Sequence, residues 1–86
     1  MVYSTIDYNI LSITMSKKYS PKYQKLIQKL RAARLGAGLT QVDAGKKLKK
    51  PQAYLSKIER GERSIDAIEL GEIARIYRKD ITYFIK

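Results

Sequence analysis

The chain has 86 residues, of which 44% are hydrophobic, so it is long enough for one globular domain with a small core. It contains neither cysteine nor histidine, which excludes disulfides, thiolate or imidazole metal sites and the usual pairs of catalytic nucleophile and base. Its 18 Lys and Arg against 8 Asp and Glu give a net charge of +10, which draws a small domain to polyanions: nucleic acid, an anionic membrane surface or an acidic protein.

Residues 1–14 differ in composition from the rest of the chain. Asp7 is their only charged residue, and they are rich in Ile, Tyr and Thr, which favour strands. Three interpretations are open: a flexible tail, a strand that pairs with a second copy, or a natural start at Met15. We therefore divide the chain into an N-terminal extension over residues 1–19, flexible or dimer-pairing, and a domain over residues 20–86.

The first predicted helix begins at Ser20 and Pro21, because Ser is a good N-cap and Pro fits the first helical turn. Gly36 and Gly38 are predicted to end it, since glycine is common just beyond a helix. Between them lies an apolar stripe at helical spacing. The stripe consists of Tyr23, Leu26, Ile27, Leu30 and Ala33.

A second, shorter helix is predicted to begin after Thr40, because Thr40 and Asp43 have the spacing of a capping box. It reaches about Leu48, and Lys49 and Lys50 then turn the chain.

The third predicted helix is Pro51–Arg60, and Gly61 ends it. Asp66 and Glu69 have capping spacing for a fourth helix, and Asp80 opens a last short helical turn. The fourth helix carries Leu70, Ile73, Ala74 and Tyr77, and the last turn carries Ile81, Phe84 and Ile85. Together these segments predict an all-α, compact five-helix domain.

The third predicted helix has two distinct faces when its residues are placed 100° apart. One face is apolar and consists of Tyr54, Leu55 and Ile58, and the other consists of Gln52, Ala53, Ser56, Lys57 and Arg60. The second face matches a DNA major groove, where Gln can bond adenine, Lys and Arg reach guanine or phosphate, and Ala contacts a thymine methyl. Any surface helix has a solvated polar face, however, so this face alone does not establish DNA binding.

The segment Leu39–Arg63 closely resembles the helix-turn-helix of the phage-repressor and Cro-like family, also called XRE. The residues that carry the resemblance are Leu39–Gln41 before the first helix of the motif and Leu55–Gly61 in the second. The resemblance extends over about Leu26–Phe84. It implies a lambda-repressor-like helix-turn-helix fold and a DNA-binding function.

The resemblance also implies roles for individual residues. Gln41, at a helix N-terminus that favours an anion, is expected to contact a phosphate and to brace Gln52. Four residues of the third predicted helix are expected to face the edges of DNA bases: Gln52, Ala53, Ser56 and Lys57. The DNA backbone is expected to lie near Gln41, Lys49, Lys50, Arg60 and Arg63.

Two further charged residues are expected to be structural. Glu59 falls beside the apolar Leu55 on the wheel, where a carboxylate requires a partner, and the resemblance implies an ion pair with Arg34.

The chain departs from the family pattern at four positions. Lys49 stands where the turn usually has glycine, Ala44 where leucine is usual, and Gly45 where alanine is usual. Gly71 replaces a large apolar residue in the fourth helix. We therefore expect a domain that is less stable than its relatives or packed differently around Ala44 and Gly71.

The expected function is sequence-specific binding of double-stranded DNA by a transcriptional regulator, in particular a repressor that binds a palindromic operator as a homodimer. The alternative is a protein-interaction adaptor or an antitoxin on the same scaffold, so a protein partner is left open. No catalytic residue, cofactor or metal ligand is predicted, and we do not expect an enzyme. Residues considered for the dimer surface, with core packing as the alternative, are Tyr77, Tyr83, Phe84 and Ile85.

The chain has no apolar stretch of about 20 residues, which a membrane span needs, and its N-terminus lacks the pattern of a signal peptide. We therefore expect a cytoplasmic protein that does not bind membranes. Some basic residues before the motif could form an arm over the DNA backbone or a solvated surface. They are Lys17, Lys18, Lys22 and Lys25.

Overall fold

The computed structural model describes residues 20–86, and the predicted extension, residues 1–19, lies outside the described residues. From residue 20 to residue 86 the chain forms five helices and no strand. They are α2 (Pro21–Gly36), α3 (Gln41–Leu48), α4 (Gln52–Glu59), α5 (Ala67–Ile76) and α6 (Thr82–Ile85). The predicted all-α, five-helix architecture is confirmed. None of these helices has both the length and the apolarity that crossing a bilayer requires.

The helix starts follow the predicted caps. The Ser20 hydroxyl accepts the Tyr23 N–H at the start of α2. Capping boxes open α3, through Thr40 and Asp43, and α5, through Asp66 and Glu69. Helix α4 is the exception, because its N-cap is a proline and no side chain caps it. The Tyr54 N–H bonds the Pro51 carbonyl oxygen at 3.0 Å, so the N–H groups of Gln52 and Ala53 are the ones that can serve an external acceptor.

The four longer helices share one kind of C-terminal turn, in which a residue just beyond the helix adopts a left-handed conformation. In each turn the next N–H bonds a carbonyl five residues back, for example from Lys50 to Gly45 at 2.8 Å. Gly36 is itself the last residue of α2, and Gly38 takes the left-handed position. The left-handed residues are Gly38, Lys49, Gly61 and Arg78, with φ of 75°, 58°, 76° and 60°.

Two of these positions carry a side chain that the left-handed conformation disfavours, by about 1–2 kcal/mol. We expect Arg78→Gly to raise the free energy of unfolding by about 1 kcal/mol, measured by urea denaturation. Arg78→Ala is the matched control, since it removes the guanidinium but keeps a Cβ at φ of 60°. Equal stabilities for the two variants would contradict the prediction.

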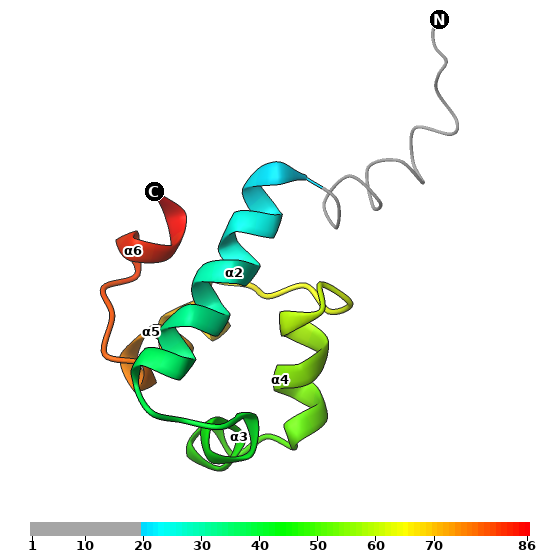
Figure 1. The fold of residues 1–86 in the computed structure, drawn as a ribbon, viewed down its shortest axis with the longest axis vertical. Helices are drawn as coiled ribbons and strands as arrows, with labels where there is room; N and C mark the ends of the chain where they lie inside the picture. The colour runs from blue at the N-terminus through cyan, green and yellow to red at the C-terminus, as the bar shows by residue number, and fades with distance from the viewer. Residues whose placement is uncertain (1–19) are drawn as a thin grey trace, which may run out of the picture.

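The hydrophobic core joins all five helices around Leu30, Leu55, Ile58 and Ile73, each at most 2% exposed. Figure 1 shows α3 beyond the C-terminal end of α2, whereas α6 lies nearer its N-terminal half. The remaining buried members are Ala33, Ala44, Tyr54, Leu70, Ala74, Tyr77 and Phe84.

Burial decides between the dimer surface and core packing for two of the four residues considered. Tyr77 is 2% exposed and Phe84 is 3% exposed, so both belong to the core, while Ile85 remains 65% exposed. Tyr83 is half-buried, and its ring meets that of Phe84 edge-on at 5.0 Å between centroids. The Tyr77 hydroxyl is buried without a hydrogen-bond partner among the described residues, which costs stability.

The unusual small residues have three different environments. Ala44 is fully buried in the cluster that contains Tyr54 and Tyr77. A Cβ at Gly45 would lie only 2.7 Å from the Lys50 carbonyl oxygen, so the turn after α3 requires glycine there. A Cβ at Gly71 would meet no atom within 4 Å.

Candidate nucleic-acid interface

Helix α4 presents one face to the core and the other to solvent. Its apolar face, Tyr54, Leu55 and Ile58, is buried. On the opposite side Gln52, Ala53, Lys57 and Arg60 are exposed and Ser56 is half-buried. The side chains predicted to contact bases therefore share one accessible surface, as the helical wheel indicated.

Behind this surface lies a buried ion pair between α2 and α4. The Arg34 guanidinium donates to both Glu59 carboxylate oxygens, from Nε at 2.7 Å and from Nη2 at 3.0 Å. The exposed fractions of the two side chains are 8% and 5%. Arg34 Nη1 also donates to the Leu39 carbonyl oxygen at 2.9 Å, and the hydrogen bond with Glu59 raises the pKa of Arg34. The pair thus fixes α4 to the end of α2.

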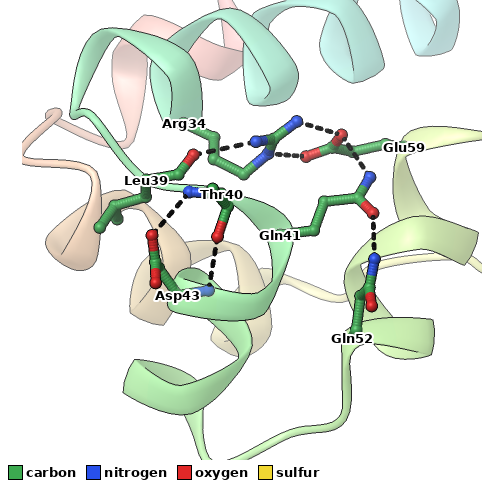
Figure 2. Close-up of polar contacts among 7 residues, drawn as sticks. All are labelled: Arg34, Leu39, Thr40, Gln41, Asp43, Gln52 and Glu59. Carbon is green, nitrogen blue, oxygen red and sulfur yellow. Dashed lines mark hydrogen bonds and ion pairs between the residues drawn. The ribbon is translucent and has the colours of Figure 1, made fainter.

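Two glutamine amides extend this pair toward the surface (Figure 2). Gln41 Nε2 donates to Glu59 Oε1 at 3.0 Å, and Gln52 Nε2 donates to Gln41 Oε1 at 3.3 Å. The capping box of Thr40 holds the start of α3, from which Gln41 projects. A continuous set of hydrogen bonds therefore leads from Arg34 to the first residue of α4.

The donor and acceptor of each hydrogen bond in this series follow from the Glu59 carboxylate. An ionised Glu59 only accepts, so Gln41 must turn its NH2 group toward it and its oxygen toward Gln52. Gln52 then has to donate, and its oxygen and second N–H have no partner among residues 20–86. One N–H donor beside one oxygen acceptor matches the N7 and N6 groups of adenine in the major groove.

The residues predicted to contact the DNA backbone differ in their present contacts. Lys49 and Lys50 are exposed in the turn between α3 and α4. Arg60 binds Glu62 in an exposed ion pair at 2.9 Å and donates to the Ser56 hydroxyl at 2.7 Å. These bonds use three of the five guanidinium N–H groups, so one N–H on each terminal nitrogen is left for a phosphate.

Arg63 is directed toward α5 instead of lying along α4. Its Nη2 donates to Glu69 at 2.8 Å, and its guanidinium lies 4.8 Å from the centre of the Tyr54 ring. Lys50 Nζ lies 5.3 Å from the same centre. Burial raises the pKa of Tyr54 to about 12, so its hydroxyl stays protonated at neutral pH. Arg63 thus holds the loop after α4 in place.

Sequence reasoning missed the carboxylates that engage these arginines. Glu62 follows Arg60 by two residues across the turn at Gly61, and Glu69 meets Arg63 from the first turn of α5. The capping spacing of Asp66 and Glu69 identified Glu69 only as a helix cap. The pairing of Glu69 with Arg63 depends on the path of the loop between α4 and α5, which no local sequence pattern indicates.

The comparisons with known proteins agree with this geometry. A family model described as helix-turn-helix matches residues 30–84. A solved structure of an XRE-family like protein from Pseudomonas syringae pv. tomato str. DC3000 is 32% identical, with a TM-score of 0.73 over 83% of this chain and 87% of that one. A search of curated proteins gives no match. The chain belongs to the XRE-like helix-turn-helix family of DNA-binding transcription regulators.

Proposed function

We propose that the protein recognises a specific double-stranded DNA site by placing α4 in the major groove, and that it represses transcription from that site. The observation that carries the proposal is the hydrogen-bonded chain from Arg34 through Glu59 and Gln41 to Gln52. It orients an exposed amide before any ligand binds, which lowers the entropic cost of binding a base.

Charge and helix ends support the same proposal. The net charge of +10 supplies the sequence-independent attraction to phosphates. The uncapped start of α4 and the start of α3 provide N–H groups and positive dipole ends for phosphate oxygens. Exposed Lys49 and Lys50 add positive charge next to the start of α4.

Two copies on one palindromic operator follow from the small size of the contact surface. Helix α4 has only eight residues, and about half of them face solvent, so one copy can contact few bases. Two copies joined on half-sites about 34 Å apart, one turn of DNA, bind more tightly than either copy does alone. We therefore propose a homodimer on a two-fold symmetric site.

Selection of bound sequences from a random duplex pool, at near-physiological salt, tests the proposal. We expect the wild-type chain to enrich a two-fold symmetric motif, and the selected site to lower transcription when placed over a promoter. The control variant Lys49→Ala/Lys50→Ala should bind all sequences more weakly but select the same motif, because phosphate contacts carry no sequence information. A pool that stays random with the wild-type chain would refute specific binding.

A further inference from the structure

A groove of about 590 Å³ lies between the N-terminal half of α2 and the last residues of the described chain. Leu26, Phe84 and Ile85 contribute apolar surface to it, and Ile85 is 65% exposed. Leu26 is partly buried against the core. The groove therefore offers apolar surface that this part of the chain does not cover itself.

Lysines surround this apolar surface. Lys22, Lys25 and Lys86 line the groove, and none of them forms an ion pair within residues 20–86. No carboxylate side chain lines it. The side chains that line the groove therefore carry positive charge and no negative charge.

A fourth lysine shapes the groove instead of facing a ligand. Lys29 Nζ donates to the carbonyl oxygens of Tyr83 and Lys86, at 3.0 Å each, and lies 5.6 Å from the centre of the Tyr83 ring. These contacts tie α6 to α2. The groove is consequently built by the fold, with both walls fixed to each other.

The groove and the candidate DNA surface lie toward opposite ends of α2. Lys25 precedes Arg34 by nine residues, which corresponds to about 13 Å along a helix axis. Figure 1 shows α6 near the N-terminal half of α2 and α3 beyond its other end. A ligand in the groove can therefore leave Gln41 and Gln52 accessible.

We propose that this groove binds an acidic amphipathic helix of a partner protein. Such a helix places apolar residues at i, i+3, i+4 and i+7 on Leu26, Phe84 and Ile85, and its flanking carboxylates meet Lys22 and Lys25. A second copy of this chain would instead bring two lysine-rich rims together, and like charges in an interface are costly. Charge complementarity thus selects an acidic partner.

Binding of a synthetic acidic peptide to the full chain, followed by fluorescence anisotropy, tests this proposal. The probe is a labelled peptide of about 18 residues, about five helical turns, with Leu at i, i+3, i+4 and i+7 and Glu at most other positions. We expect saturable binding that Lys22→Glu/Lys25→Glu weakens at least about tenfold. Ile85→Ser, at an exposed position, should weaken it without changing the thermal unfolding midpoint.

The matched control is Lys46→Glu/Lys47→Glu, which makes the same change in net charge at exposed positions on α3. It should leave the affinity within about twofold. A scrambled peptide of the same composition should bind at least about tenfold more weakly, because it lacks the apolar stripe.

Four results would overturn the proposal. They are an absence of saturable binding, an equal loss in the control variant, binding of anionic phosphatidylglycerol vesicles with no binding of the peptide, and self-association that Ile85→Ser abolishes. The second would indicate attraction by net charge alone, the third a membrane surface, and the fourth a second copy of the chain in the groove. None of the four bears on DNA recognition by α4.

Discussion

Replacing Arg34 by Met lowers the free energy of unfolding by about 3–5 kcal/mol, the usual cost of removing one partner from a buried ion pair. The Glu59 side chain, 5% exposed, would keep its carboxylate in the core with only Gln41 as a donor. The Leu39 carbonyl would lose the donor it now has in Arg34. Urea denaturation measures the change, followed by far-ultraviolet circular dichroism because the chain has no tryptophan.

The exposed pair of Arg60 and Glu62 is the control within the same chain. Its side chains are 56% and 46% exposed, and Arg60→Met should change stability far less than Arg34→Met does, because water screens an exposed ion pair. The double variant Arg34→Met/Glu59→Met should regain part of the loss, because no charge stays buried alone. Equal effects of Arg34→Met and Arg60→Met would contradict a structural role for the buried pair.

Two glycine-to-alanine substitutions are expected to have opposite signs. Gly45→Ala should lower the free energy of unfolding by about 1–3 kcal/mol, because the new methyl would lie 2.7 Å from the Lys50 carbonyl oxygen. That oxygen belongs to the backbone, so relief requires the turn after α3 to move. Thermal unfolding should show a clear decrease in midpoint.

Gly71→Ala is the matched substitution in α5, where a Cβ meets no atom within 4 Å. It should raise stability by about 0.5–1 kcal/mol, the helix-propensity difference between the two residues. A stabilising effect of Gly45→Ala would contradict the close approach of Gly45 to the Lys50 carbonyl oxygen.

The helix boundaries and the exposed face of α4 could be predicted because they depend on neighbouring residues. Ser20, Thr40 and Asp66 cap helices through bonds that span only three residues. The alternation of apolar and polar residues likewise decides which side of α4 faces the core. Such short-range chemistry is visible in the sequence itself.

Other features depend on how the backbone turns and could not be predicted. No residue pattern around Arg78 indicates the left-handed conformation that it adopts, which glycine usually occupies. At Lys49 the resemblance shows only that glycine is usual there, and the lysine nevertheless keeps the left-handed turn. Gly45 looks like a weak point in a helix, but the approach of the Lys50 carbonyl makes it necessary. The ion pair of Arg63 with Glu69 likewise depends on the loop between α4 and α5.

The chain of hydrogen bonds also links stability to recognition. Arg34 orients Glu59, Glu59 orients Gln41, and Gln41 orients the Gln52 amide. A substitution at the buried Arg34 therefore affects the orientation of the exposed Gln52 amide.

The most direct test of base recognition by α4 is the binding profile of Gln52→Ala on the motif selected by the wild-type chain. We expect discrimination to fall by about 1–3 kcal/mol at one base pair in each half-site, with the other positions and the salt dependence unchanged. Because Gln52 is exposed, the variant should remain folded. A Gln52→Ala variant with the full wild-type preference at every position would contradict recognition of DNA bases by this residue.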